Sequence, residues 1–439
     1  MRKLILSLAA TPLILGSMAV SAQAADDGFN VFSDVKFKGE LRPRYQFSDR
    51  KATTADAGHQ LTNRTNLNFS AKLFETDGLN GTMELNAVND FGTEQQANKD
   101  VGGEALGAKI SQANISYTVA GVTGIAGRKT VNLDNQRFIG SVGWKQNFQT
   151  FDLAAVAYGT GGFSIIGAYV YGVNAIGDMG YDYGRSPEPK YAGGIASGRT
   201  NSALVNASYK IMDEVKLTGY AYLLGSASDT YGLAATGKVG MGDIGKLTYR
   251  AEFAAQQKAT LKTFGNPVSA NPEHPDSLLG SAIYMNVDVG ANISGFLVGL
   301  NYEVLGGADV NDAKTSQFQT PLATKHKFNG WADQFLGTPS TGLADLNIRG
   351  GYKSKSIGKV LAVYHMFNAA ADGATGSGVS SGDAYGSELD LLYATKVPGV
   401  NNLTAVLKGA IYMDNTDNGV TADDTTLAWL MLDYKFATK

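Results

Sequence analysis

The sequence of 439 residues contains 54 glycines, 10 prolines, 21 tyrosines and 19 phenylalanines, a composition typical of aromatic-rich strands joined by tight turns. It has 37 Lys and Arg residues against 40 Asp and Glu residues, so no overall basic charge points to nucleic-acid binding. Cysteine is absent, which excludes a disulfide framework and thiolate metal sites.

The N-terminus has the pattern of a secretory signal peptide. Basic residues at 2–3 precede the apolar residues 4–20, and Ala-Gln-Ala at 22–24 forms a small-residue cleavage site. We expect residues 1–24 to be removed and residues 25–439 to form one domain. No mature stretch reaches about 18 consecutive apolar residues, which excludes spanning by helices, whereas a barrel needs only about 10 residues per strand.

The first predicted strand covers residues 35–47 and alternates strictly between an apolar and a polar face. Its polar face consists of Lys36, Lys38, Glu40, Arg42, Arg44 and Gln46. An alternation of this length exceeds the usual soluble strand and matches a tilted membrane-spanning strand with a polar interior.

The same pattern recurs along the chain and predicts an all-β fold, a transmembrane antiparallel up-and-down β-barrel. Short turns and long connections alternate, as in bacterial barrels with short periplasmic turns. An even strand number then places both ends of the mature chain on the periplasmic side. About 18 strands are expected, at 35–47, 64–73, 82–87, 108–119, 122–131, 147–159, 162–173, 200–212, 214–224, 230–239, 245–257, 280–291, 295–306, 343–354, 357–368, 384–397, 401–413 and 424–436.

The last predicted strand resembles the aromatic-terminated signal read by the outer-membrane insertion machinery, because Tyr434 and Phe436 lie on its apolar face. We therefore expect the protein in the outer membrane of a Gram-negative cell. The expected partners are that machinery, membrane lipid, lipopolysaccharide and small hydrophilic solutes, and no nucleic acid. Whether barrels associate as monomers or trimers stays open.

Two blocks of sequence resemble the alginate-export family of outer-membrane porins. The first is GRKTVNLDNQRFIGSVGWKQNFQTFDL at 127–153. The second is HKFNGWADQFLGTPSTGLADLNIR at 326–349, followed by AVYHMFN at 362–368 and YGSELDLLY at 385–393. The resemblance implies a barrel of about 18 strands with an arginine-rich interior. It does not fix the cargo.

Basic side chains on the polar faces are the candidate pore-lining residues. A charge facing lipid near the midplane costs about 2–4 kcal/mol, so an inward direction is expected for each. Such a wall would attract carboxylates and phosphates. In the alternative, the arginines pair with inward carboxylates and only cross-link the wall, as in a general porin. The candidates are Arg42, Arg44, Arg64, Arg128, Arg250, Arg349, Lys36 and Lys38.

The connection at 132–146 carries Arg137, Trp144 and Lys145 and is a candidate constriction loop that folds inward. In the alternative, its aromatic side chains pack at the membrane interface, a zone that Trp and Tyr favour. The connection at 307–342 presents the same two alternatives.

An enzymatic barrel would need a nucleophile, a base and an orienting group close together. The histidines that could serve as the base are His59, His274, His326 and His365, of which only His365 lies in a predicted strand. We predict no enzyme, no catalytic residue and no cofactor. The acidic segment at 414–424 lacks the closing Glu of a calcium loop, so no metal site is expected.

Together these features predict a channel for passive diffusion or export of hydrophilic solutes, including anionic saccharides such as alginate or other uronates. The alternatives are a general porin with little selectivity, an adhesin or structural barrel, and a barrel hydrolase.

Overall fold

The structure is a computed structural model that describes residues 30–51, 56–93, 99–100, 104–176, 190–192, 195–225, 227–257, 281–308, 316–372, 379–415 and 424–438. The predicted signal peptide at 1–24 and His274 lie outside the described residues, as does most of the acidic segment at 414–424. The start of the mature chain at residue 25 therefore stays a prediction.

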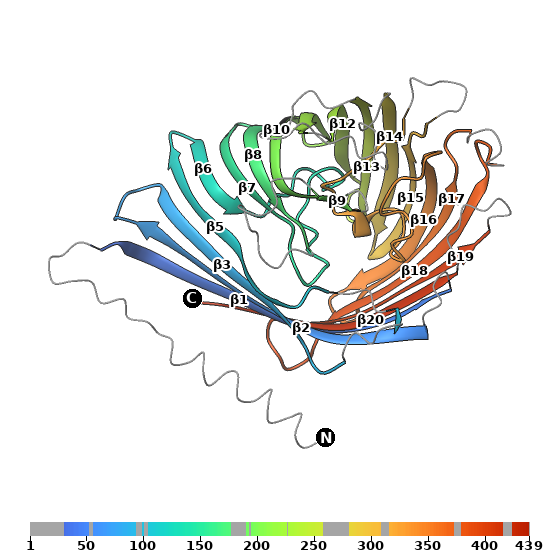
Figure 1. The fold of residues 1–439 in the computed structure, drawn as a ribbon, viewed down its shortest axis with the longest axis horizontal. Coiled ribbons are helices and arrows are strands. Elements are labelled where there is room, and N and C mark those ends of the chain that lie inside the picture. Colours follow the sequence, from blue (N-terminus) through green and yellow to red (C-terminus); the bar gives the residue numbers. More distant parts are fainter. Residues whose placement is uncertain are drawn as a thin grey trace, which may run out of the picture.

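Eighteen antiparallel strands form one closed barrel, which confirms the predicted all-β class (Figure 1). Two short strands, β4 (Lys99–Asp100) and β9 (Lys190–Ala192), pair at its edge. The barrel strands are β1 (Phe32–Arg50), β2 (Asp56–Leu73), β3 (Leu79–Asp90), β5 (Gly107–Val119), β6 (Val122–Lys129), β7 (Thr150–Thr160), β8 (Phe163–Asn174), β10 (Ile195–Met212), β11 (Val215–Leu224), β12 (Ser228–Gly240), β13 (Gly245–Gln257), β14 (Ala282–Ile293), β15 (Phe296–Leu305), β16 (Leu343–Ser354), β17 (Gly358–Asn368), β18 (Ala384–Lys396), β19 (Leu403–Asp414) and β20 (Thr425–Ala437).

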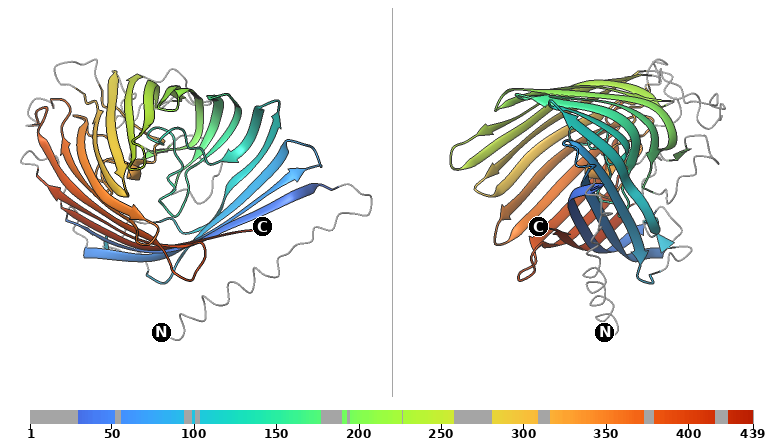
Figure 2. Two further views of the ribbon diagram at one scale, coloured as in Figure 1. Left: turned by 180° about the vertical axis from the view of Figure 1, so that it is seen from behind. Right: turned by 90° about the vertical axis from the view of Figure 1, so that its left-hand side faces the viewer.

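The barrel closes between its first and last strands. β1 pairs with β2 on one side and with β20 on the other, so that Tyr45 lies opposite both Leu61 and Leu430. The tilted strands surround a common interior, as the rotated views show (Figure 2). The turns at 120–121, 161–162, 213–214 and 294–295 are at one end, which we call the short-turn end. In outer-membrane barrels this end faces the periplasm.

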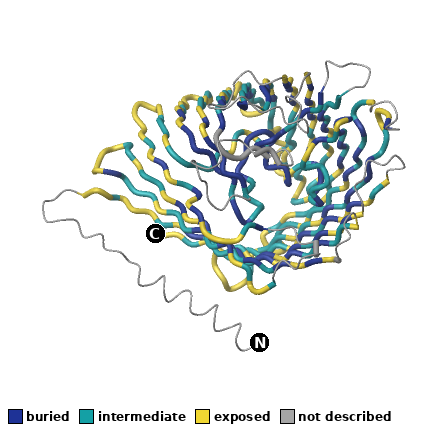
Figure 3. Tube along the Cα trace, viewed as in Figure 1, coloured by how far each residue is buried: buried dark blue, intermediate teal, exposed yellow. Residues whose placement is uncertain are grey.

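Alternation along each strand separates an outer apolar face from an inner face. In β13, Phe253 is 50% exposed, whereas its neighbours Glu252 and Ala254 are 5% and 0% exposed. Contact with lipid favours an apolar outer face, and polar residues that face inward avoid the free-energy cost of contact with lipid. In the Cα trace, buried residues lie along the strands and in the connections inside the ring, whereas exposed residues gather at the short turns (Figure 3). Among the described residues, no helix has the length and apolar character needed to cross a membrane.

Two connections lie inside the ring of strands (Figure 1). We call residues 130–149 the first inward segment and residues 316–342 the second; the second contains a short 3-10 helix, η1 (Lys325–Lys327). Phe138 of the first segment packs against the wall, with ring centroids 5.3 Å from Tyr220 and 5.2 Å from Tyr284. Its ring is also 5.9 Å from that of Phe318 in the second segment. The segments and the wall thus share one aromatic core.

Candidate functional site

Arginines of β1 bind the backbone of the first inward segment. Arg42 donates from Nη1 to the carbonyl of Gly143 at 3.0 Å and from Nη2 to that of Lys145 at 2.6 Å. Arg44 donates to the carbonyl of Trp144 at 2.7 Å. A guanidinium presents several donors in a fixed plane, which suits consecutive carbonyl oxygens. These predicted pore residues therefore position the segment that carries Trp144 and Lys145.

Carboxylates balance most of this positive charge. Arg64 Nη2 lies 2.6 Å from Glu40 Oε1, and Arg44 forms an ion pair with Glu104. Arg42, Arg44 and Arg64 are only 4%, 1% and 3% exposed. Three guanidinium groups and two carboxylates leave one positive charge, which the segment carbonyls help to stabilise. The arrangement matches the cross-linking alternative more closely than an open basic wall.

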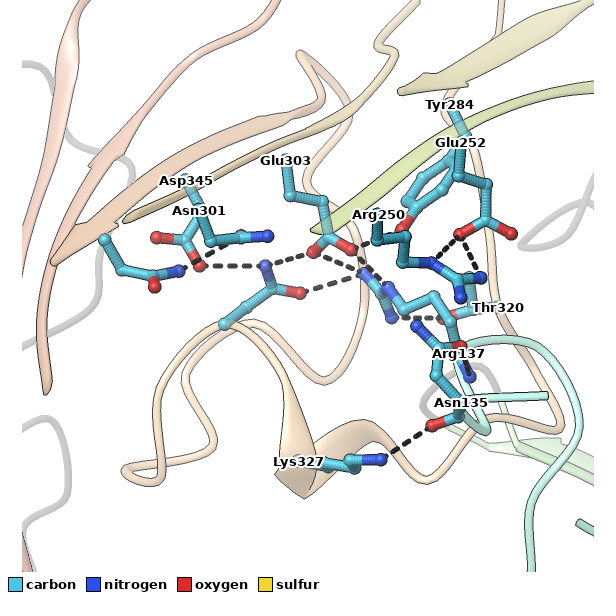
Figure 4. A network of polar contacts seen from close by, with 12 residues as sticks. Asn135, Arg137, Arg250, Glu252, Tyr284, Asn301, Glu303, Thr320, Lys327 and Asp345 are labelled. Carbon is cyan, nitrogen blue, oxygen red and sulfur yellow. Dashed lines mark hydrogen bonds and ion pairs between the residues drawn. The ribbon is translucent and has the colours of Figure 1, made fainter. Parts of the chain in front are cut away.

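A second anchor joins both inward segments to β15 (Figure 4). Arg137 Nε lies 2.7 Å from Glu303 Oε1, and its Nη2 lies 3.1 Å from Oε2, a bidentate pair. The same Nη2 donates to Asn329 of the second segment at 2.9 Å. Tyr284 donates its hydroxyl to Glu303 at 2.7 Å. Arg137, which the sequence places in a candidate constriction loop, is thus a buried side chain that connects both inward segments to the barrel wall.

The two other inward arginines also have carboxylate partners. Arg250 Nη2 lies 2.7 Å from Glu252 Oε2 (Figure 4). Arg250 also pairs with Asp134 of the first segment. Arg349 binds both oxygens of Asp288, at 2.6 and 2.7 Å. The Arg349 pair connects wall to wall and touches neither inward segment.

Arg128 does not point inward as predicted. Alternation along β6 places it on the face of the exposed Val122 and Ala126, opposite Ile125, which packs against the interior core. Its Nε and Nη2 bind the two oxygens of Asp152 at 2.7 and 3.0 Å. Because this bidentate pair neutralises the charge at the end of the strand, the cost of an isolated charge at the membrane midplane does not apply.

Carboxylates of β18 hold the second inward segment through its backbone amides. Ala332 N–H donates to Glu388 Oε1 at 2.7 Å, and Trp331 N–H donates to Asp390 Oδ1 at 3.4 Å. Gly330 has a φ of +83°, and a Cβ at this position would overlap the Glu388 carboxylate. Glycine therefore allows the close approach. The first segment is held by arginines through carbonyls, and the second by carboxylates through N–H groups.

The three tryptophans of the chain gather around Lys408 of β19. Its Nζ lies 4.2 Å from the ring centroid of Trp144, 3.8 Å from that of Trp331 and 5.3 Å from that of Trp429. One tryptophan comes from each inward segment and one from β20. A cation over several aromatic faces is stabilised by their quadrupoles. Lys408 therefore joins both segments to the barrel.

His326 of η1 completes this contact. Its Nδ1 lies 2.7 Å from Asp333 Oδ1 and its Nε2 lies 2.6 Å from Lys408 Nζ. A charged Lys408 can only donate, so Nε2 accepts and Nδ1 carries the proton that binds Asp333. Burial lowers the pKa of His326 from 6.5 to about 4; Lys408 acts in the same direction, whereas Asp333 opposes it.

We expect acid to loosen the second segment. Because the pKa of His326 is depressed in the docked state, docking loses stability as pH falls below 6.5, by about 3 kcal/mol in total once pH passes about 4. Tryptophan emission should shift to longer wavelength over this range. The variant His326→Gln keeps an acceptor without a titrating ring and should flatten the profile. An identical profile in the variant would contradict the assignment to His326.

Lys36 and Lys38 lie on the inner face of β1 near the short-turn end and are exposed. Neither makes an ion pair within the part of the chain that the structure describes. Sequence reasoning missed Glu104, Lys408 and Asp333. Alternation along 401–413 does place Lys408 inward, but nothing local signals its tryptophan partners.

No protein-family model and no curated protein matches the chain. Solved structures do. OccK3 (OpdO) of Pseudomonas aeruginosa is 12% identical, with 93% of this chain and 97% of that chain covered and a TM-score of 0.65. OccAB3 of Acinetobacter baumannii is 14% identical, with 92% and 100% covered and a TM-score of 0.69. OccK9 (OpdG) of P. aeruginosa is 13% identical, with 92% and 99% covered and a TM-score of 0.67.

At these identities the likeness shows the fold alone, a closed antiparallel barrel of 18 strands. The resemblance to the alginate-export family is not shown by these comparisons.

Proposed function

We propose that this protein is an outer-membrane channel through which small hydrophilic solutes diffuse passively. The observation that carries the proposal is the pair of inward segments fixed to the inner wall by buried polar contacts, chiefly Arg137 with Glu303 and Arg42 with the first segment. A barrel with such fixed segments has a permanent narrow region lined by polar groups. This arrangement selects solutes by size and polarity.

We extend the proposal to anionic organic solutes, including uronate saccharides. The sequence blocks that resemble the alginate-export family, 127–153 and 326–349, contain most of the two inward segments. Lys36 and Lys38 add positive charge to the inner wall. Carboxylates are the natural counterions of such side chains.

A general porin is the second candidate, favoured by the pairing of the inward arginines with carboxylates. A wall of matched charges orients water and passes polar solutes with little selection. The two candidates differ in ion selectivity and in block by saccharide.

Planar-bilayer recording of the purified mature protein tests the proposal. We expect single-channel conductance, a reversal potential on the anion side under a KCl gradient, and reversible block by oligouronates. Conductance without selectivity or block would support the general porin. Absence of conductance would contradict the channel and favour an adhesin or structural barrel.

A further inference from the structure

Lysines line the inner wall at the short-turn end of the barrel. The five residues nearest to the short turns in each barrel strand include ten lysines and no arginine. Alternation places all ten inward; for example, Lys359 shares the face of the buried His365 and Phe367, and Lys246 shares that of Arg250. We call this set the lysine ring: Lys36, Lys72, Lys210, Lys216, Lys238, Lys246, Lys353, Lys359, Lys396 and Lys435.

Few acids balance the lysine ring. In the same strand ends, the acidic residues are Asp34 and Asp433, and the adjoining short turns add Glu75, Asp77, Asp213, Glu214 and Asp243. Three ring lysines have carboxylate partners: Lys72 at 2.6 Å from Asp77, Lys210 at 2.5 Å from Asp213 and Lys435 at 3.1 Å from Asp433. The other seven make no ion pair with any described residue. The side chains of Asp77 and Asp213 belong to turns and are 97% and 85% exposed, so they lie in solvent beyond the inner wall.

Strand register sets like charges directly opposite each other within the ring. Lys210 lies opposite Lys216 between β10 and β11, and Lys353 lies opposite Lys359 between β16 and β17. Directly opposed like charges destabilise a sheet. A multivalent anion between them would convert this repulsion into attraction. The arrangement therefore favours binding of an anion over stability of the empty wall.

We propose that the lysine ring is a binding site for multivalent anions, such as polycarboxylates and phosphates, at the periplasmic mouth of the barrel. The proposal rests on the proposed channel function and places its anion preference here, because the inward arginines are already occupied. A charged mouth with low-dielectric walls concentrates counterions. Lysine is a compact, strongly hydrated charge without the bidentate fork of arginine, which suits ions that must leave again.

The test is block by inorganic tripolyphosphate added to one side of the bilayer. Sidedness is established with an impermeant thiol reagent on the variant Ser356→Cys, since the chain has no other cysteine and residue 356 lies in a short turn. We expect tripolyphosphate to block from the short-turn end at concentrations at least about tenfold lower than from the opposite end, where the long connections lie. Block should weaken with ionic strength, because the Debye length is about 8 Å at physiological salt.

Substitution identifies the lysines responsible. Lys353→Gln with Lys359→Gln should weaken the block by about tenfold, equivalent to about 1.4 kcal/mol. The double Arg variant, Lys353→Arg with Lys359→Arg, should preserve it. Lys51→Gln, at an exposed residue at the opposite end of the barrel, is the matched control and should have no effect.

Three outcomes would overturn the proposal that the lysine ring binds anions. They are equal block from both sides, no block at all by tripolyphosphate in a conducting channel, or an equal loss of block in Lys51→Gln and in the double Gln variant. Each of these leaves the channel itself intact. Absence of conductance in the native protein would instead contradict the proposed function.

Discussion

Replacing Arg137 with Met should release both inward segments and raise the single-channel conductance. The guanidinium is 2% exposed, and its removal leaves Glu303, 3% exposed, without its cation. Removing one partner of a buried ion pair typically destabilises the folded arrangement by about 3–5 kcal/mol. That cost falls on the docked arrangement, because undocking lets water reach Glu303. We expect larger and noisier currents in bilayer recordings, with the barrel still folded.

Arg349→Met is the matched control for this prediction. Its pair with Asp288 is also bidentate, but the two side chains are 25% and 27% exposed and connect wall to wall. Water can hydrate Asp288 when the partner is lost, so the conductance should stay near the native value. Combining Glu303→Gln with Arg137→Met removes the unpaired carboxylate of Glu303. The double variant should therefore keep the inward segments docked more often than Arg137→Met alone, with a conductance closer to the native value. Equal conductance changes in the Arg137 and Arg349 variants would contradict the role of Arg137 in holding the inward segments against the wall.

The barrel follows from the sequence because its determinants are local. Strict alternation over 35–47 specifies one lipid-facing and one inward face for β1, and a slip of one residue would reverse them. The same rule places Arg250 and Arg349 inward, where the structure has them. The inward prediction is wrong for Arg128, because alternation along β6 places it on the outer face, and the ion pair with Asp152 of the neighbouring β7 removes the expected cost of its charge at the strand end.

The contacts inside the barrel could not be predicted in the same way. Arg137 and Glu303 are separated by 166 positions, and their pairing depends on how two long connections fold back. Both sides of such a contact are polar residues with several possible partners. Alternation gives the direction of Glu303 but not the identity of the loop residue that reaches it. The sequence therefore left open whether these connections fold inward or pack at the rim.

Replacing Lys408 with Met should loosen the tryptophan cluster and shift tryptophan emission to longer wavelength. Methionine keeps the apolar length of the side chain but removes the charge and the hydrogen bond to His326. A desolvated cation over an aromatic face is worth about 2 kcal/mol or more, and here three rings contribute. The carboxylates of Asp333 and Asp390, which interact electrostatically with Lys408, would also lose a counter-charge.

Emission reports on this site alone, because the chain has only three tryptophans and all of them surround Lys408. Access of a neutral quencher such as acrylamide should rise together with the emission shift. Lys408→Arg keeps a cation that can stack on the rings and should stay close to the native spectrum. Lys51→Met, at a side chain that is 67% exposed, controls for loss of a lysine elsewhere. If Lys408→Met left both emission and quenching unchanged, aromatic and apolar packing alone would hold the inward segments against β19 and β20.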